Sequence, residues 1–429
     1  GRRARTYARD GLDAEPGNRA CRALLLRAEA TPSAHSDSLR VGEQLAHVAL
    51  YSTGQENAGD KVLPESVRMC FGVDTGPERW LSVPVHRLFG EEELERVNAR
   101  RGLVIGGGGL FLPDTWPNGN SAWQWNVTDE TIARITVPVA VFAVGYNVFD
   151  GQSFGGPDSA SGPESASWRE RRFRESLRAL VERSAFFGLR NHGSVERVRE
   201  LLPARLRDRV RFQPCPTTVA RHLIPGWREP ESRPADGSGS GSGLGPVLLN
   251  CAYDRAGLRF GHDYGQFLEQ MAHAVRRLGR RAQVRYAAHM PADERFVRDL
   301  RREHGITLPV DPLYDASNRE IYDVYARAAL VIGMRGHATM IPFGCGTPVL
   351  SLVSHPKMAY FLADIGRPEW GLSVHRSDLG AVLSERGTAL LSEHAAAVAD
   401  VRERQDALWK VTQENLAELR TVFGGGGTS

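Results

Sequence analysis

Lysine is almost missing from this sequence of 429 residues: only Lys61, Lys357 and Lys410 occur. The other basic side chains are arginines, and the formal net charge is only +3. So mild a charge, with no basic helix interleaved with aromatic residues, is not that of a nucleic-acid-binding protein. Because lysine is so rare, each of these three positions is of interest.

Cysteine is also sparse: the chain has five, and no two have the C-x-x-C spacing. This pattern supports neither a disulfide framework nor a zinc site, and no other metal-ligand cluster is evident. The longest apolar stretch, residues 135–149, is too short and too interrupted by glycine and proline to span a bilayer. Residues 1–20 lack the apolar core of a signal peptide. We therefore expect a cytoplasmic protein without a transmembrane segment.

What the sequence does contain is a regular alternation of short apolar runs and helical patterns. Strands are predicted at 44–52, 80–85, 102–107, 138–146, 185–190 and 209–214, and then at 246–253, 282–289, 329–334, 347–353 and 371–375. Helices are predicted at 90–100, 167–184, 263–279, 291–304, 318–328, 337–344 and 357–365, with a last one over about 377–422. Such alternation predicts parallel sheets covered by helices on both faces.

A segment rich in proline, glycine and serine, 226–245, separates the two series of strands and is predicted to be a flexible linker. It divides the chain into an N-terminal Rossmann-like domain, 44–225, and a C-terminal one, 246–422. Residues 1–43 are interpreted as a partly disordered extension and 423–429 as a flexible tail. The expected fold is therefore α/β, with two Rossmann-like domains facing across a cleft, and ligands bind beyond the carboxyl ends of such strands.

The stretch "RGHATMIPFG" follows a predicted strand and places Arg335, Gly336 and His337 at the start of helix 337–344. A helix N-terminus favours anions through its free N–H groups and its dipole, and an arginine adds paired donors. A histidine there is suited to general acid catalysis near neutral pH. No acidic residue stands nearby in the sequence, which favours an anion site over a structural ion pair. Lys357 repeats the arrangement at the start of the next predicted helix.

Two other polar or glycine-rich turns follow strands of the first domain. Asn57 and Asp60 precede a helix expected to begin at 62–63, and they are either turn and cap formers or site residues. Gly107 and Gly108 belong to a run of four glycines, which either exposes N–H groups to an anion or serves packing. The sequence leaves both alternatives open.

A tryptophan-rich segment, 113–126, comes after the glycines and carries Trp116, Trp123 and Trp125 among polar residues. Aromatic side chains flanked by asparagine and aspartate are suited to stacking on a sugar ring. A local hydrophobic core built from the same indoles is the alternative. If they stack on a sugar, this segment faces the cleft from the first domain.

Arg190 stands at the end of predicted strand 185–190. Asn191 and Ser194 follow it and are placed to cap a helix that begins near Val195. Arg190 either reaches an anion in the cleft or pairs with an acidic neighbour, and the sequence favours neither.

The motifs "NAGD", "IGGGGLF", "GLRNHGS", "RGHATMIPFGCGTPVLSL" and "HPKMAYFL", taken in this order, resemble the polysaccharide pyruvyltransferase family over about 44–366. The resemblance implies a glycosyltransferase-B-like fold and an enzyme that uses phosphoenolpyruvate to build pyruvate ketals on sugars. Phosphoenolpyruvate is then a co-substrate, and no further cofactor or metal is required. The family's Arg-x-His maps onto Arg335 and His337, and its Asn-x-Gly-Asp maps onto Asn57 and Asp60.

On the donor side, the resemblance implies that Arg335, Lys357 and Arg190 bind the phosphate and carboxylate of phosphoenolpyruvate, with Gly336 and His337 beside them. Protonation of the methylene carbon creates an oxocarbenium-like centre that one sugar hydroxyl attacks. A second hydroxyl then displaces phosphate and closes the ketal. His337 is expected to deliver the first proton or to protonate the departing phosphate.

On the acceptor side, a sugar or glycoside is the expected partner. Asp60 is the expected base on its hydroxyl, and Asn57, Gly107, Gly108 and the three tryptophans are expected to contact it. Two alternatives remain: a nucleotide-sugar-dependent glycosyltransferase of the same fold, and a catalytically silent glycan-binding protein. The identity of the acceptor and the oligomeric state stay open.

Overall fold

The computed structural model describes residues 43–51, 57–112, 118–146, 165–227, 244–253 and 263–424. Within them, two six-stranded sheets form, in the orders β2-β1-β3-β4-β5-β6 and β12-β11-β10-β7-β8-β9. Every neighbouring pair of strands is parallel. The prediction of two Rossmann-like α/β domains is thereby confirmed. Residues 1–42, 228–243 and 425–429, which hold most of the expected extension, linker and tail, lie outside the described residues.

The strands lie where the apolar runs predicted them, with one addition. The first sheet contains β1 (Leu45–Ala49), β2 (Trp80–Pro84), β3 (Gly102–Gly106), β4 (Val139–Val144), β5 (Phe186–Leu189) and β6 (Val210–Phe212). The second contains β7 (Val247–Asn250), β8 (Val284–Ala288), β9 (Val310–Pro312), β10 (Leu330–Gly333), β11 (Val349–Val353) and β12 (Gly371–Ser373). The sequence did not predict β9, because its residues Val-Asp-Pro are only half-buried and form no apolar run.

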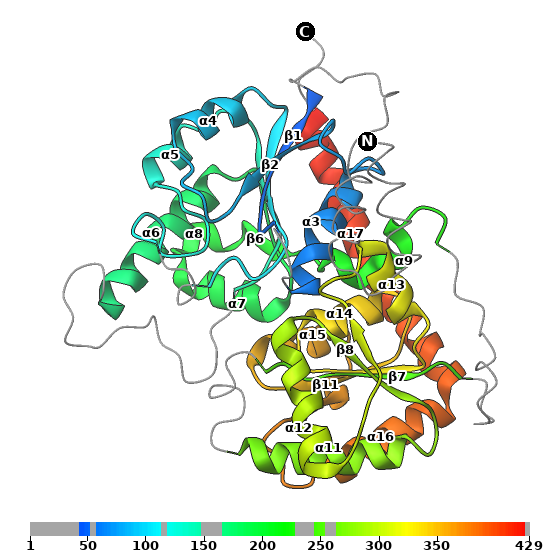
Figure 1. Ribbon diagram of the computed structural model, residues 1–429. Coiled ribbons are helices and arrows are strands. Elements are labelled where there is room, and N and C mark those ends of the chain that lie inside the picture. The colour runs from blue at the N-terminus through cyan, green and yellow to red at the C-terminus, as the bar shows by residue number, and fades with distance from the viewer. Residues whose placement is uncertain are drawn as a thin grey trace, which may run out of the picture.

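Helices cover both faces of each sheet (Figure 1). Those between the strands of the first domain are α3 (Ala58–Phe71), α4 (Glu91–Asn98), α5 (Asp129–Ala133), α6 (Ala166–Arg183), α7 (His192–Leu201) and α8 (Ala204–Arg207), followed by α9 (Ala220–Leu223). Those of the second are α11 (Tyr264–Leu278), α12 (Glu294–His304), α13 (Asn318–Ala326), α14 (His337–Gly344), α15 (Pro356–Asp364), α16 (Leu379–Ser392) and α17 (His394–Gly424). Short 3₁₀ helices η3 (Pro216–Val219), η4 (Pro291–Asp293) and η5 (Pro368–Trp370) join some of them.

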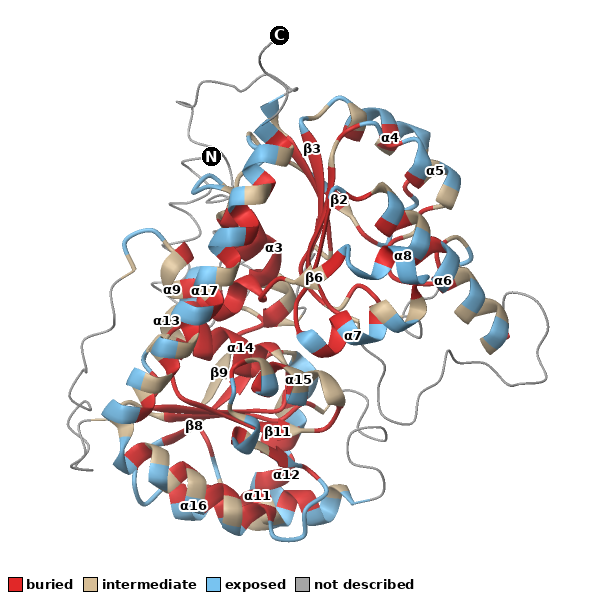
Figure 2. Cartoon of the chain, turned by 180° about the vertical axis from the view of Figure 1, so that it is seen from behind, coloured by how far each residue is buried: buried red, intermediate tan, exposed pale blue. Residues whose placement is uncertain are grey.

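The strand residues alternate between two hydrophobic cores. In β3, Leu103 and Ile105 face a core that belongs to the first domain alone. Val104, between them, faces a larger core that continues into the second domain and includes Leu248 and Ile332. Figure 2 shows this buried region running from α3 through α14 to the second sheet. The two domains are thus packed against each other on the α3 and α14 side.

The end of the chain differs from the prediction of one helix over 377–422. Two helices form, α16 and α17, and α17 returns to the first domain (Figure 1). There Glu418 pairs with Arg211 of β6, and the Asn415 amide donates to the Phe212 carbonyl at 3.0 Å. Phe423 packs against Gly102. The last helix therefore connects both domains. None of the described helices is long and apolar enough to cross a membrane.

Candidate active site between the two domains

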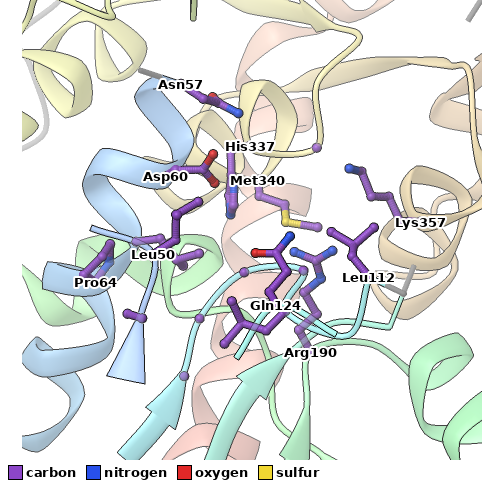
Figure 3. A pocket seen from close by; sticks show the side chains of 18 of the residues that line it. Leu50, Asn57, Asp60, Pro64, Leu112, Gln124, Arg190, His337, Met340 and Lys357 are labelled. Carbon is purple, nitrogen blue, oxygen red and sulfur yellow. The ribbon is translucent and has the colours of Figure 1, made fainter. Parts of the chain in front are cut away.

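A cavity of about 160 Å³ lies between the domains, at the carboxyl ends of both sheets (Figure 3). Its apolar lining includes Leu50, Leu63, Leu112 and Met340. The polar side chains that line it are Asn57, Asp60, Gln124, Arg190, Arg335, His337, His355 and Lys357. The structure thus brings together the motifs that the sequence analysis selected from segments far apart in the chain.

The glycine run after β3 forms one wall of this cavity, which Gly107 and Gly108 both line. Gly107 has φ +80° and Gly108 has φ +86°, a left-handed conformation that favours glycine. A Cβ on Gly107 would also lie 2.8 Å from the Leu63 side chain of α3. The packing alternative is observed at this turn, and the glycines also line the cavity, although the Gly107 N–H donates to the Phe142 carbonyl at 3.1 Å.

Arg190, at the end of β5, points into the cavity (Figure 3) and is only 6% exposed. Gly145 makes room for it: a Cβ there would lie 2.5 Å from the guanidinium carbon. Among the described residues, no carboxylate forms an ion pair with this side chain, and its Nε has no hydrogen-bond partner. Burial lowers the pKa of Arg190, although an arginine remains charged. Of the two alternatives for Arg190, pairing with an acidic neighbour is therefore not what this structure contains.

The expectation that Arg335 has no acidic partner is wrong, because the buried Asp293 pairs with it. Its Nη2 and Nε donate to the Asp293 carboxylate at 2.6 and 2.9 Å. Both side chains are buried, at 6% and 0% exposure. The two residues are 42 positions apart in sequence. They meet because β7 alone separates β8, which precedes Asp293, from β10, which precedes Arg335. The fork of Arg335 is thus occupied by a structural pair.

His337 begins α14, as expected, and no side chain caps this helix N-terminus. Burial, and then the charges of Arg190 and Lys357, lower the pKa of His337 to about 3. The imidazole is therefore neutral at pH 7 while the cavity holds no anion. Its Nε2 lies 3.8 Å from the Cys215 Sγ. A role for His337 as general acid stays a prediction, and the lowered pKa means that the ring would have to gain a proton before acting as one.

Lys357, in the first turn of α15, points toward the centre of the cavity from the second domain (Figure 3). The Gly336 backbone also lines the cavity, and a Cβ there would lie 3.7 Å from the Lys357 Cε. Asp60 faces the cavity from the first turn of α3. The cavity therefore has cationic side chains on both sides and one carboxylate at its edge.

Helix α3 begins at Ala58, four residues before the start expected at 62. Asn57 is its N-cap, with Oδ1 accepting from the Gly59 N–H at 3.0 Å. The same oxygen lies 3.3 Å from the His289 Nδ1 of the second domain. Capping is therefore the role that the structure gives Asn57. In α7 likewise, Asn191 caps a helix that begins at His192, three residues before the expected start.

Trp123 and Trp125 do not face the cavity, contrary to the expectation that they stack on a sugar. Both are 0% exposed in the core of the first domain, where Phe111 and Phe89 contact their rings. The local-core alternative is the one observed, because buried indoles find apolar partners on the sheet. Trp116 lies outside the described residues.

Three buried residues in or beside the site were not selected from the sequence. Asp293 also accepts the His289 and Met290 N–H groups, at 3.2 and 3.1 Å. Asn250, at the end of β7, accepts the Arg335 N–H at 3.3 Å. Gln124, between the two buried tryptophans, points into the cavity. Asn250 and Gln124 are polar residues between apolar ones, a pattern that can be seen in the sequence. The pairing of Asp293 with Arg335 can be seen only in the fold.

Two domains of parallel strands with a cation-lined cavity between them define a glycosyltransferase-B-like architecture. The sequence model of the polysaccharide pyruvyl transferase family matches residues 90–356, and the chain belongs to this family. This confirms the resemblance found in the motifs, and it supports a transferase that modifies polysaccharides. No curated protein has a sequence that matches the chain.

Comparison with solved structures gives similarities at low sequence identity. A protein assigned as a UDP-N-acetylglucosamine 2-epimerase from Listeria monocytogenes has 12% identity and a TM-score of 0.48, covering 90% of this chain and 98% of its own. The UDP-GlcNAc 2-epimerase from Neisseria meningitidis has 10% identity and a TM-score of 0.45, covering 87% and 100%. The wall teichoic acid polymerase TagF has 9% identity and a TM-score of 0.42, covering 99% and 98%. The fold assignment does not depend on these similarities.

Proposed function

We propose that this protein transfers the pyruvyl group of phosphoenolpyruvate to two hydroxyls of a sugar, forming a ketal and releasing phosphate. The observation that carries the proposal is Arg190, a buried guanidinium without an ionic partner among the described residues, aimed into a cavity that also contains Lys357 and His337. A buried cation without a partner is costly, and an anionic ligand offsets that cost. Membership of the pyruvyl transferase family supplies the reaction class.

Phosphoenolpyruvate has two anionic groups, and the cavity has matching cations on its two sides. In the proposed complex Arg190 and Lys357 bind the phosphate and the carboxylate by charge-assisted hydrogen bonds. The Gly336 and His337 N–H groups at the start of α14, which have no hydrogen-bond partner among the described residues, add backbone donors. Arg335, held by Asp293, contributes to the wall and to the field of the site rather than a free fork.

The proton steps follow from the charges around His337. An anion between Arg190 and Lys357 cancels two of the causes that lower the pKa of this imidazole, so its pKa rises on binding. The protonated ring then donates its proton to the methylene carbon, and Asp60 takes the proton of the sugar hydroxyl that attacks the resulting centre. The second hydroxyl forms the remaining C–O bond as the bond to phosphate breaks. The proton of this second hydroxyl returns to the neutral ring, and the phosphate leaves with the proton held by Asp60. Each step uses side chains of this chain.

Family membership favours this donor over a nucleotide sugar, because the family model that matches the chain is that of polysaccharide pyruvyl transferases. Isothermal titration of phosphoenolpyruvate beside UDP-GlcNAc and other nucleotide sugars tests the choice. We expect binding of phosphoenolpyruvate alone. Preferential binding of a nucleotide sugar would contradict the proposal, and phosphate release in the presence of glycosides excludes a silent binding protein.

A further inference from the structure

Gln124 is a buried polar side chain of the cavity that the proposed donor chemistry does not use. It is 7% exposed, and its carboxamide points into the cavity beside Arg190 and Met340 (Figure 3). Within the described part of the chain, neither end of the carboxamide has a hydrogen-bond partner. Because its amide atoms open onto the cavity, a ligand hydroxyl can take the place of water on them, and each such hydrogen bond is worth about 0.5–1.5 kcal/mol.

The surrounding segment holds Gln124 in this orientation. Trp123 and Trp125 are fully buried on either side, and the Trp123 Nε1 donates to the Ser176 hydroxyl at 3.0 Å. The Ser121 hydroxyl donates to the Trp125 carbonyl at 2.5 Å, and the Gln124 N–H donates to the Leu110 carbonyl at 3.3 Å. With both neighbours fixed in the core, the Gln124 side chain stays directed at the cavity.

The chemistry of a carboxamide indicates which ligand it fits. Its Nε2 donates and its Oε1 accepts, so it complements a hydroxyl, which does both. Phosphate and carboxylate oxygens only accept, so they would use Nε2 alone and leave Oε1 without a donor. Arg190 and Lys357 already provide cationic donors for such groups. We propose that Gln124 binds the acceptor sugar through its hydroxyls, next to the donor subsite, and thereby selects a neutral polyol.

This inference rests on the proposed function, in that the cavity holds a donor and a sugar side by side. Its test uses Gln124→Met, which has nearly the same shape and no hydrogen-bonding groups. The control is Gln283→Met, the same substitution at an exposed glutamine beside β8. Saturation-transfer NMR measures binding of the methyl β-glycosides of glucose, galactose and mannose without donor, and calorimetry measures binding of phosphoenolpyruvate.

We expect Gln124→Met to lower the affinity for the glycoside about 5- to 30-fold, which is the range of one or two neutral hydrogen bonds. The affinity for phosphoenolpyruvate should change less than two-fold. Gln283→Met should change neither. Unchanged glycoside affinity in Gln124→Met, an equal loss for phosphoenolpyruvate, or no binding of any of the three glycosides to the wild-type protein would overturn the assignment. If glycoside binding depends on Gln124 but phosphoenolpyruvate does not bind, the assignment of Gln124 to the sugar is supported and the proposed transferase is refuted.

If Gln124→Met does not fold, Gln124→Glu serves as the second variant, because it keeps the shape and remains polar. Its carboxylate would lie beside Arg190 and pair with it. We expect glycoside affinity to fall as above and phosphoenolpyruvate affinity to fall at least ten-fold, since the anion site is then occupied. A glutamate variant with wild-type affinity for both ligands would show that Gln124 does not face the bound sugar.

Discussion

Arg190 and Arg335 line the same cavity but are held differently. Arg335 is paired with the buried Asp293 carboxylate. Arg190 has no ion pair among the described residues, and Gly145 packs directly against its guanidinium. Removing one partner of a buried pair leaves an uncompensated charge, whereas removing an unpaired buried cation does not. The two arginines should therefore respond to substitution in opposite ways.

Arg335→Met is expected to lower the free energy of unfolding by roughly 3–5 kcal/mol, because Asp293 is left buried and unpaired. Arg190→Met should leave that free energy unchanged or raise it, and should weaken phosphoenolpyruvate binding by roughly 1.5–3 kcal/mol, the worth of a hydrogen bond to a charged group. Urea unfolding and calorimetry measure the two effects. Loss of stability in Arg190→Met with intact donor binding would show that its role is structural.

His337→Gln keeps a hydrogen-bonding side chain but cannot carry a proton. We expect donor affinity within several-fold of normal and a loss of about 10²–10⁴ in single-turnover rate. Because a bound anion raises the pKa of His337 from about 3, binding of phosphoenolpyruvate at pH 7 should take up protons, and the variant should take up fewer. Titrations in two buffers of different ionisation enthalpy count those protons. Equal proton uptake and equal rate in both proteins would assign the proton to another group.

Several of these residues were predictable from the sequence alone. Arg190, His337 and Lys357 each follow a strand in the sequence, and the carboxyl ends of parallel strands meet at one edge of a sheet. The pairing of Arg335 with Asp293 was not predictable, because it depends on β7 lying between β8 and β10. Local sequence shows neighbours along the chain but not across a sheet.

At the level of elements, apolar runs predicted strands well because parallel strands are buried on both faces. β1, β3 and β4 are buried at every residue. The first residues of helices were less predictable, because whether a polar side chain caps a helix depends on the backbone geometry of the loop before it. In α3 and α7 the asparagine before the helix caps it, so the helix begins at once. β9 has no buried residue and left no pattern to detect.

His47 of β1 is hydrogen-bonded to both β3 and α3, next to the glycine turn. Its Nε2 donates to the Gly106 carbonyl at 3.1 Å, and its Nδ1 accepts from the Arg68 Nε of α3 at 3.4 Å. Burial, and then the charge of Arg68, lower the pKa of His47 to about 3. In the unfolded chain the pKa is about 6.5, so the folded state binds fewer protons between these values. The contribution of His47 to the free energy of unfolding is therefore complete above pH 6.5 and is lost as the pH falls below that value.

His47→Gln should therefore make the protein less sensitive to acid. Between pH 7 and pH 5.5 the wild-type free energy of unfolding should fall by roughly 1 kcal/mol more than that of the variant. Urea unfolding at the two pH values measures the difference, and His289 and His337 contribute equally to both proteins. An identical decline in the two proteins would mean that His47 is charged in the folded state.

Across the whole molecule, the domains are joined by more than their connecting segment. One hydrophobic core continues from the first domain into the second, and α17 packs on both. The Ala58 N–H of α3 donates to the His289 carbonyl of the second domain at 3.0 Å. The Lys61 ammonium donates to the carbonyls of Tyr314 and Ala316 at 2.9 and 2.6 Å. These contacts hold the two domains together in the arrangement in which both line the cavity.

Lys61→Met is expected to weaken this contact, because two buried carbonyls lose a charged donor. The free energy of unfolding should fall by about 2 kcal/mol, and phosphoenolpyruvate affinity should fall several-fold because α3 and the second domain together line the cavity. Lys410→Met is the matched control, since Lys410 is exposed on α17. Urea unfolding and calorimetry on both variants make the comparison. If the two variants behave alike, the Lys61 contact does not hold the domains together.

The central claim is that phosphoenolpyruvate donates its pyruvyl group to a sugar in this cavity. The most direct test incubates the protein with phosphoenolpyruvate and a panel of methyl glycosides, and follows phosphate release and the mass of each glycoside. The account predicts that one phosphate is released for each glycoside that gains a pyruvyl ketal, and that Arg190→Met lowers both signals at least ten-fold when phosphoenolpyruvate is subsaturating. Transfer of a sugar from a nucleotide donor, with phosphoenolpyruvate unchanged, would contradict it.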